Sequence, residues 1–340
     1  MYSLLRQILF SLDPEHAHTI SLTCLGVAER LRLLPLFCPG TVSDPLERLG
    51  LRFDNPVGLS AGLDKNGDYF NALGQLGFGF VEIGTVTPKP QAGNQKPRLF
   101  RLEEHHALIN RMGFNNKGLD YLLERVQQRR YSGVLGINIG KNKSTPDAEA
   151  LADYQMAMHK VYPYGDYIAV NISSPNTPGL RKLQFGDHLK RLLEGIKRAQ
   201  QQLTQAHQCY KPILVKIAPD MNETEVKHLS ETLIGYEIDG VIATNTTLDR
   251  SAVASHPLAG EAGGLSGAPL TDASTALIAQ LRSHLGRLPI IGVGGIMQGS
   301  DAAAKIKAGA DLVQIYTGFI DKGPSLIKES VNAIRQARPA

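Results

Sequence analysis

The sequence predicts a (β/α)8 barrel, and three features predict it. After about residue 50, eight short apolar segments of strand length recur, separated by longer stretches of helical character. Each segment is continuously apolar rather than alternating, which is typical of parallel strands covered on both faces. The segments also share polar or glycine-rich endings, which a barrel brings together at one mouth. A doubly wound sheet is the alternative, but it would have fewer strands and a point where the strand order reverses.

In chain order, we expect strands at residues 57–62, 80–86, 134–140, 167–174, 213–218, 241–245, 290–294 and 312–317. Helical stretches such as "DHLKRLLEGIKRAQQQL" and "SDAAAKIKAGA" lie between them. Two connections, 87–133 and 247–289, are longer than the others. Long loops at a barrel mouth usually line or cover the site, so we expect both of them near it.

Residues 1–40 stand apart as a short helical extension, and residues 41–340 form the barrel. Leu5, Ile8 and Leu12 belong to an apolar helical stripe, and Asp13-Pro14 has the pattern of an N-cap followed by proline at the first helical position. A second helix is expected to run to about Leu34. These helices could pack on the barrel, form a dimer contact or lie in a membrane surface. Their balanced charge does not indicate attraction to anionic lipid, so packing on the barrel ranks first.

The composition is that of a soluble globular protein and excludes several classes. Lys and Arg number 36 against 32 for Asp and Glu, and no arginine-rich tract or basic stripe is present, so we expect no nucleic-acid partner. Cys24, Cys38 and Cys209 lie far apart without a C-x-x-C pair, which predicts neither a metal site nor a disulfide framework. The N-terminus lacks the pattern of a signal peptide or a spanning helix, which favours the cytoplasmic side.

The strand endings are rich in amides and hydroxyls. The polar residues expected around the mouth are Thr85, Asn138, Asn171, Ser174, Lys216, Thr244 and Asn245. Ordinary loop polarity accounts for Asp and Gly, but it accounts poorly for Asn and Thr inside apolar runs. Because an amide carries both a donor and an acceptor, such a set suits a neutral ring whose edge alternates N–H and C=O, a cyclic imide or ureide. Ser173 and Ser174 have no evident histidine or carboxylate partner, so a hydrolase triad is unsupported.

The glycine cluster "GVGGI" at 292–296 indicates a phosphate site. A dinucleotide fingerprint would require a small residue at position 297, which is Met297. Glycines that bring backbone N–H groups close to an anion at the start of a helix explain the cluster better, with "YTGF" at 316–319 as the partner loop. A tight turn alone would explain one glycine but not this group.

Lys216 lies inside the apolar strand "ILVKIAP". Burying a lysine without a partner is unfavourable, so a merely solvated side chain is a poor explanation. Two functions remain open from the residues alone: a Schiff-base nucleophile, or a fixed cation beside a cofactor that gains negative charge. Lys65 lies in a loop, where a lysine is usually just solvated.

Over nearly its whole length, in order, the chain resembles the quinone-linked (class 2) dihydroorotate dehydrogenases, and most of all the bacterial ones. The motifs that carry the resemblance are "AGLDKNG", "EIGTVTPKPQAGNQKPRLFRL", "INRMGFNNKG", "GINIGKNK", "NISSPNTPGL", "VKIAPD", "GVIATNTTLDR", "GGLSG", "IIGVGGI" and "LVQIYTGFI". The resemblance implies a barrel that binds FMN and oxidises (S)-dihydroorotate to orotate in de novo pyrimidine (UMP) biosynthesis. It also implies that hydride passes to FMN and electrons then pass to a membrane quinone.

The resemblance assigns roles to particular residues. Ser174 would be the catalytic base, where the soluble class has cysteine. The substrate would be held by Lys65, Asn110, Arg111, Met112, Gly113, Phe114, Asn171, Asn176, Asn245 and Thr246. FMN would be held by Ala61, Gly62, Leu63, Asp64, Lys65, Thr85, Asn138, Asn171, Lys216, Thr244, Gly267, Gly295, Tyr316 and Thr317. Lys216 would stabilise the reduced flavin, which argues against a Schiff base. The quinone site would include His18 and Arg101, and Thr177 with a bound water is our hypothesis for the proton relay.

The resemblance also implies that residues 1–40 face membrane and quinone, so we expect a monomer held peripherally at the cytoplasmic face of the cell membrane. Three alternatives stay open. One is another FMN barrel acting on a related pyrimidine ring. The others are a Schiff-base lyase or phosphate-binding isomerase that uses Lys216, and a non-catalytic flavin-binding or membrane-docking module.

Overall fold

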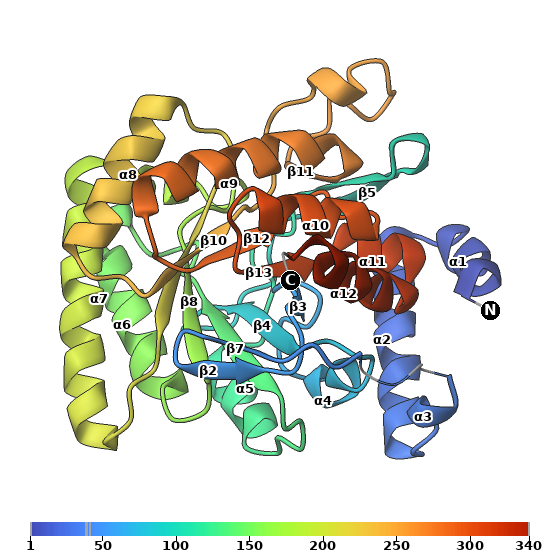
Figure 1. Ribbon diagram of the computed structural model, residues 1–340, viewed down its shortest axis with the longest axis horizontal. Helices are drawn as coiled ribbons and strands as arrows, with labels where there is room; N and C mark the ends of the chain where they lie inside the picture. The colour runs from blue at the N-terminus through green and yellow to red at the C-terminus, as the bar shows by residue number, and fades with distance from the viewer. Residues whose placement is uncertain (1, 38–39, 41, 339–340) are drawn as a thin grey trace.

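The computed structural model describes residues 2–37, 40 and 42–338, and it confirms the barrel. Eight parallel strands close on themselves in sequence order around one axis (Figure 1). They are β3 (Val57–Leu59), β4 (Phe80–Val86), β7 (Val134–Ile139), β8 (Tyr167–Asn171), β9 (Ile213–Ile217), β10 (Gly240–Ala243), β12 (Ile290–Val293) and β13 (Leu312–Ile315). β13 pairs with β3 and so closes the barrel.

Most strands end before the predicted limit. The predicted strands at 57–62, 167–174 and 312–317 include polar endings, but the observed strands stop at Leu59, Asn171 and Ile315. The backbone beyond these points turns into the loops of the mouth. The apolar runs are continuous because both faces of each strand are covered: Val81 and Ile83 pack among the residues of the outer core, while Phe80 packs in the barrel interior.

Helices surround the barrel and bury its outer face (Figure 1). They are α4 (Phe70–Gly74), α5 (Leu119–Val126), α6 (Ala150–Val161), α7 (Gly186–His207), α8 (Glu223–Gly235), α9 (Thr271–Leu285), α10 (Gly299–Lys307), α11 (Thr317–Lys322) and α12 (Ser325–Ala337). Short 3-10 turns lie at η1 (Glu103–His105), η2 (Asp147–Glu149), η3 (Leu180–Gln184), η4 (Ser251–Val253) and η5 (Ala268–Leu270). Helix α7 shows how the sequence encodes this layer, since Leu189, Leu193 and Ile196 recur at helical spacing and are buried.

A short hairpin that the sequence did not reveal packs against the barrel interior. Strands β1 (Leu46–Arg48) and β2 (Leu51–Phe53) pair antiparallel. The ring of Phe53 meets the ring of Phe80 edge-on, with centroids 5.2 Å apart. These rings join an interior cluster that includes Tyr167 and Leu214, so the barrel is a packed core rather than a pore.

The two long connections meet in a second small sheet. Strands β5 (Leu99–Leu102) and β6 (Ala107–Asn110) form a hairpin, and β11 (Gly264–Gly267) joins β6 antiparallel. Leu102, Ile109 and Leu265 form an apolar cluster within this sheet. The two connections that we expect near the site, 87–133 and 247–289, therefore both contribute strands to one sheet, although they lie far apart in the sequence.

The N-terminal extension forms α1 (Tyr2–Phe10), α2 (Pro14–Arg30) and α3 (Leu34–Phe37), beside the barrel in Figure 1. The predicted cap is confirmed, since Asp13 Oδ1 accepts hydrogen bonds from the N–H groups of Glu15 and His16 at 3.0 and 2.9 Å. Helix α2 contacts α4 and β5, so packing on the barrel is observed. Large apolar side chains nonetheless stay exposed, namely Leu5, Ile8, Leu12, Ile20, Val27, Leu31, Leu33 and Leu36. None of the described helices has both the length and the apolar character needed to span a bilayer.

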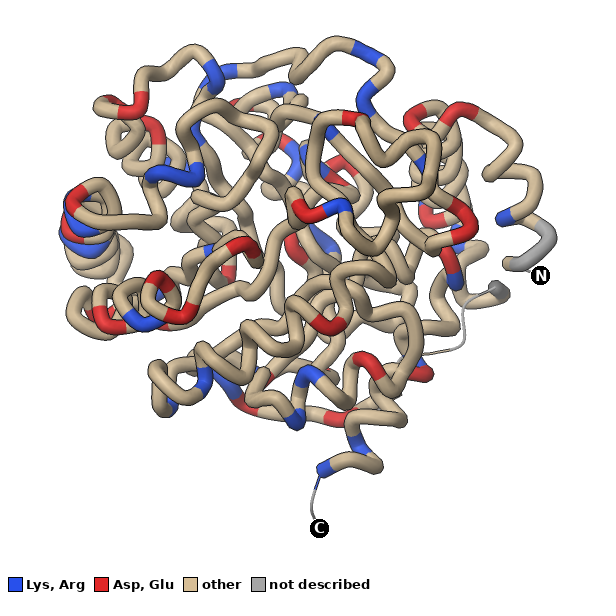
Figure 2. The backbone as a smooth tube through the Cα atoms, turned by 90° about the horizontal axis from the view of Figure 1, so that it is seen from above, with Lys and Arg blue, Asp and Glu red and all other residues tan. Residues whose placement is uncertain are grey.

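Acidic and basic residues are interspersed along the chain (Figure 2). Cys24 and Cys209 are free and exposed, and Cys38 lies outside the described residues. Within the described ranges, no three His, Cys, Asp or Glu side chains gather as a metal site would require.

Candidate active site

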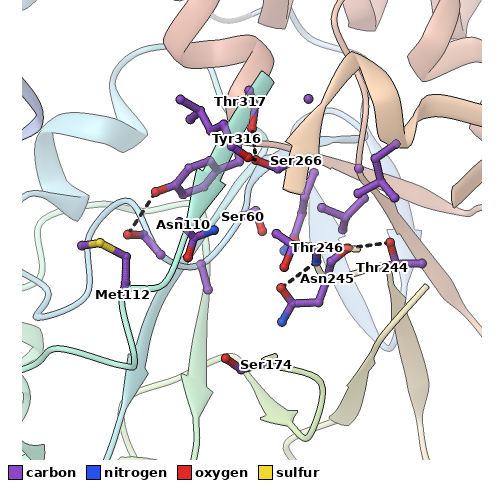
Figure 3. A pocket seen from close by; sticks show the side chains of 18 of the residues that line it. Ser60, Asn110, Met112, Ser174, Thr244, Asn245, Thr246, Ser266, Tyr316 and Thr317 are labelled. Atoms are coloured by element: carbon purple, nitrogen blue, oxygen red, sulfur yellow. Dashed lines mark hydrogen bonds between the residues drawn. The ribbon is translucent and has the colours of Figure 1, made fainter. Parts of the chain in front are cut away.

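A large cavity lies at the carboxyl ends of the barrel strands. The space between its lining residues, with the open mouth included, measures about 1230 Å³. Strand ends and the segments that follow them supply much of its wall, for example Ser60 after β3, Thr85 on β4 and Lys216 on β9. The small sheet contributes Asn110 and Ser266 (Figure 3). Active sites of barrel enzymes occupy this position, because the loops there can vary while the strands hold them rigidly.

Most of the residues singled out in the sequence come together in this cavity. Those that line it are Ala61, Gly62, Lys65, Thr85, Asn110, Met112, Gly113, Phe114, Asn171, Ser174, Asn176, Lys216, Thr244, Asn245, Thr246, Gly267, Gly295, Tyr316, Thr317 and His18. Further lining residues that the sequence reasoning missed include Ser60, Ser266 and Gln314.

Six residues to which the sequence assigned a role do not line the cavity: Leu63, Asp64, Arg101, Arg111, Asn138 and Thr177. The carboxylate of buried Asp64 accepts hydrogen bonds from the backbone N–H groups of Asp68 and Tyr69 at 2.9 and 2.7 Å, so it organises its own loop. Arg111 pairs with Glu261. Asn138 supports the cavity from behind, because its Oδ1 accepts a hydrogen bond from Thr85 Oγ1 at 2.6 Å.

A buried ion pair supports the wall around Lys216. Nζ of Lys216 donates a hydrogen bond to Ser60 Oγ at 3.0 Å and lies 3.8 Å from Oε1 of Glu82, whose side chain is fully buried. Burial lowers the pKa of Lys216, and Glu82 acts in the opposite direction. Tyr167 and Gln314 each donate to Glu82 Oε2 at 2.8 Å. Glu82 is therefore the partner that the buried Lys216 requires. Like Lys216, Glu82 stands in the sequence as a charged residue inside an apolar strand.

The amides of the wall hold one another in fixed orientations. Asn171 donates from Nδ2 to Thr85 Oγ1 at 3.0 Å, and its Oδ1 accepts from Ser173 Oγ at 2.9 Å. Asn245 donates to the same Ser173 Oγ at 3.0 Å, and Asn176 donates to Asn110 Oδ1 at 3.2 Å. Hydrogen-bonding groups held by such a network are already oriented when a ligand arrives.

Ser174 is buried, with 5% of its surface exposed, and its Oγ accepts the N–H of Asn176 at 3.2 Å. In Figure 3 it lies well apart from the group formed by Tyr316, Ser266 and Thr317. Close to it in the chain, the buried Oγ1 of Thr177 has no hydrogen-bond partner among the described residues. An unpaired buried hydroxyl normally has an explanation, such as a ligand, a water or a catalytic role.

The glycine turn after β12 lines the cavity, but not as the start of a helix. Gly294 and Gly295 have φ of +108° and +70°, and a Cβ on Gly295 would lie 2.3 Å from the backbone of Thr271. The amides that lead into α10 are already occupied, since Met297 and Gln298, just before the helix, donate to Asp301 Oδ2 at 2.9 and 3.0 Å, and Gly299, its first residue, donates to Glu329 Oε1 at 2.8 Å. An anion bound at "GVGGI" would therefore meet the turn itself rather than the N-terminus of the helix.

One wall of the cavity comes from the N-terminal extension. Glu15 and His18 of α2 line it, and Glu15 makes a double hydrogen bond with Arg98, at 2.7 and 3.1 Å. Burial lowers the pKa of His18 to about 3, with Lys65 adding to the effect, so His18 is neutral at physiological pH. Burial likewise lowers the pKa of Lys65 to about 8. The N-terminal extension thus adds an uncharged histidine to the wall of the amide-lined cavity.

Arg101 lies in a smaller cavity of about 270 Å³ beside α1. Its guanidinium donates to the carbonyl oxygens of Leu9, Phe10 and Leu12, at 3.2, 3.0 and 2.7 Å, and so caps the end of α1. His18 and Arg101 are therefore not brought together in one cavity, although both contact or belong to the extension.

A closed parallel barrel with a large, amide-lined cavity at the carboxyl ends of its strands defines an enzyme of the (β/α)8 class with room for a sizeable cofactor. Residues 46–337 match the model of the dihydroorotate dehydrogenase family, and the chain belongs to that family. Family membership implies a flavin cofactor.

Relatives and solved structures agree with this assignment. The chain is 62% identical over 338 residues to a protein of Saccharophagus degradans named dihydroorotate dehydrogenase (quinone), with 99% of this chain and all of the relative covered. It is 60% identical to a protein of the same name from Teredinibacter turnerae, with 98% and 99% covered. The crystal structure of ligand-free DHODH from Eimeria tenella has a TM-score of 0.86 at 37% identity, with 96% of both chains covered. The resemblance to the quinone-linked class is therefore confirmed.

The cavity has features that fit a flavin. Two of its groups call for a ligand, because Oγ1 of Thr246 and Oε1 of Gln314 are buried without partners among the described residues, and Lys216 adds a basic side chain to the wall. The glycine turn and the neighbouring Thr317 provide small or polar groups at one side. These donors and acceptors would suit a planar heterocycle with a phosphate tail.

Proposed function

We propose that this chain oxidises (S)-dihydroorotate to orotate, using FMN bound in the main cavity and a membrane quinone as electron acceptor. The reaction belongs to de novo pyrimidine biosynthesis. The observation that carries the proposal is the combination of four asparagines and one unassisted serine in one buried cavity at the barrel mouth. A substrate whose ring contains amide groups, and which loses a proton from a ring carbon, matches this set of residues.

The substrate would lie between the amides and Ser174. Asn110, Asn171, Asn176 and Asn245 offer donors and acceptors to its ring edge, and Lys65 with Thr246 would hold its carboxylate. Met112, Gly113 and Phe114 come from the segment after β6, where they would close over the ring. Arg111 would act on this segment from outside the cavity, through its pair with Glu261.

FMN would occupy the rest of the cavity. Its ring would lie near Ala61, Gly62, Thr85, Lys216 and Thr244, and its phosphate near Gly267, Gly295, Tyr316 and Thr317. Leu63, Asp64 and Asn138 would support these contacts from behind. When bound, the flavin supplies the acceptor for the hydride that leaves C6 of the substrate, and it passes the electrons on to quinone.

Ser174 would take the proton from C5 of the substrate. Serine is a weak base, since its alkoxide is strongly disfavoured at neutral pH, so the proton has to move on at once. The unpaired hydroxyl of Thr177 supports a relay through this residue. The small sheet would exclude bulk water and so strengthen every polar contact inside.

Lys216 would hold positive charge beside the flavin ring, where negative charge develops during the reaction. Its ion pair with Glu82 supports this role over that of a Schiff-base nucleophile. A nucleophilic lysine must be neutral. Burial acts toward the neutral form by lowering the pKa of Lys216, and the carboxylate 3.8 Å away opposes it by favouring the protonated form.

The quinone would enter past residues 1–40, which would form a unit distinct from the barrel of residues 41–340. His18 lines the main cavity from α2, while Arg101 would act by holding α1 in place. The exposed apolar side chains of these helices would dip into the cytoplasmic face of the cell membrane as a peripheral anchor. We expect a monomer.

Orotate formation with different acceptors tests the proposal. Purified protein would be mixed with dihydroorotate and either a short-chain quinone or NAD⁺, and orotate followed by its absorbance. We expect orotate with the quinone and none with NAD⁺. Orotate formed with NAD⁺ alone would contradict the acceptor, and a protein inactive with every acceptor while retaining FMN would contradict the substrate.

A further inference from the structure

A buried cation without a carboxylate partner lies behind the glycine turn. Lys305 of α10 is fully buried, and its Nζ donates to the hydroxyls of Ser274 and Thr275 near the start of α9. Within the described part of the chain, no carboxylate forms an ion pair with it. Burial lowers the pKa of Lys305 to about 7, and the charges of Asp301 and Asp272 only partly oppose this effect. Buried charges are usually paired, so this lysine calls for an explanation.

Lys305 is linked to the turn through Ser274. The hydroxyl of Ser274 accepts from Lys305 and donates to the carbonyl oxygen of Gly294 at 2.9 Å. The next carbonyl is held in the same way, because Thr271 Oγ1 donates to Gly295 O at 2.7 Å. A chain of hydrogen bonds thus runs from the buried ammonium group to the backbone of the turn.

Holding these two carbonyls toward α9 determines where the next amides point. In a trans peptide unit the N–H lies opposite the C=O, so the N–H groups of Gly295 and Ile296 point away from α9. Both residues line the cavity. Among the described residues, neither N–H has a hydrogen-bond acceptor. Two oriented donors backed by a buried positive charge are a suitable site for an anion.

We propose that Lys305 is a positioning residue for the phosphate of the flavin cofactor: through Ser274 it holds the Gly294–Gly295 turn with its amides toward the cavity, and its ammonium group lies behind the turn as a countercharge to the phosphate. The inference rests on the proposed function, because it requires a flavin that carries a phosphate. The N-terminus of α10 cannot play this part, since Asp301 and Glu329 already occupy it.

The test compares two flavins that differ in the phosphate. Flavin would be removed from the full-length protein, and the affinities for FMN and for riboflavin measured by quenching of flavin fluorescence. Lys305→Met keeps the apolar stem and removes the charge. We expect it to weaken FMN binding by about ten- to thirty-fold, the loss of one charge interaction at the effective dielectric of a protein, and riboflavin binding by less than about two-fold. Lys307→Met, an exposed neighbour on the same helix, is the matched control and should change neither.

A second pair of variants tests the link without removing the charge. Ser274→Ala releases the Gly294 carbonyl and should weaken FMN selectively. Thr275→Ala removes the other hydroxyl that accepts a hydrogen bond from Lys305. Because the Thr275 hydroxyl makes no hydrogen bond to the turn, we expect this variant to weaken FMN binding less. The flavin-free Lys305→Met protein should also melt at a higher temperature than the wild type, because an unbalanced buried charge is gone.

The outcomes separate this inference from the proposed function. Equal weakening of FMN and riboflavin, or lower thermal stability with and without flavin, would make Lys305 an ordinary structural residue and overturn the proposal. FMN binding unchanged in Lys305→Met would overturn it too. A wild-type protein that does not prefer FMN over riboflavin would instead contradict the assignment of FMN to this cavity, and the role of Lys305 with it.

Discussion

The ion pair between Glu82 and Lys216 offers a quantitative test of the site. Its charges lie 3.8 Å apart, and both side chains are buried. At the effective dielectric of about 20 that describes protein sites, this separation corresponds to about 4 kcal/mol of attraction. Removing one partner leaves the other charge buried and unpaired, which generally costs about 3–5 kcal/mol. Glu82→Gln also leaves fewer acceptors for Tyr167, Gln314 and Asn138, which donate to the carboxylate.

A double-mutant cycle isolates this interaction. Urea unfolding would be followed by circular dichroism for flavin-free wild type, Glu82→Gln, Lys216→Met and the double variant. We expect the double variant to lose about 2–4 kcal/mol less free energy of unfolding than the two single variants lose in sum, because it removes both charges together. The exposed pair Lys322–Glu329, 3.5 Å apart, is a matched control with an expected coupling below about 1 kcal/mol. Additivity at Glu82 and Lys216 within about 0.5 kcal/mol would refute the reasoning.

Three further predictions concern the base, the turn and the extension. Ser174→Ala should slow the reduction of bound FMN by dihydroorotate by about 10²- to 10⁴-fold, as measured by stopped-flow absorbance. A rate that falls by less than about tenfold would contradict the assignment of Ser174 as the base. Gly295→Ala should abolish flavin retention on gel filtration, because its Cβ would meet the Thr271 backbone, while Gly286→Ala, at a similar φ with open space around it, should retain flavin. Burial acts to raise the pKa of Glu15, but Arg98 and Lys96 outweigh it and hold this pKa below 4.5. The tether of α2 therefore stabilises the fold above that pH and weakens as the pH falls through the lower folded value, so proteolysis of α2 should increase there in the wild type but not in Glu15→Gln.

The barrel could be predicted from sequence because each of its strands is apolar on both faces and each ends in a polar turn. The β1–β2 hairpin could not, since three-residue strands carry too little periodic signal. The sheet of β5, β6 and β11 escaped prediction for a different reason. Its strands β6 and β11 pair across more than 150 residues of sequence, and no local pattern reveals such pairing.

Within the site, most of the residues that line the cavity could be predicted from the sequence, but the residues that hold them in place could not. Asn171 and Ser174 are visible because they end a buried strand. Glu82, like Lys216, is a charged residue inside an apolar strand, and Gln314 is a single polar residue in the apolar strand "LVQI", so neither one shows from sequence alone that it supports the cavity. The placement of Arg101 at the end of α1, rather than in the main cavity, depends on how the extension packs, and spacing in the chain does not determine that.

An anaerobic absorbance titration tests the central claim most directly. The purified protein would be recorded before and after addition of dihydroorotate, and again after addition of a quinone. We expect a flavin band that bleaches with dihydroorotate and returns with quinone but not with NAD⁺. A flavin band that dihydroorotate leaves unchanged would contradict the assignment of this substrate to the amide-lined cavity.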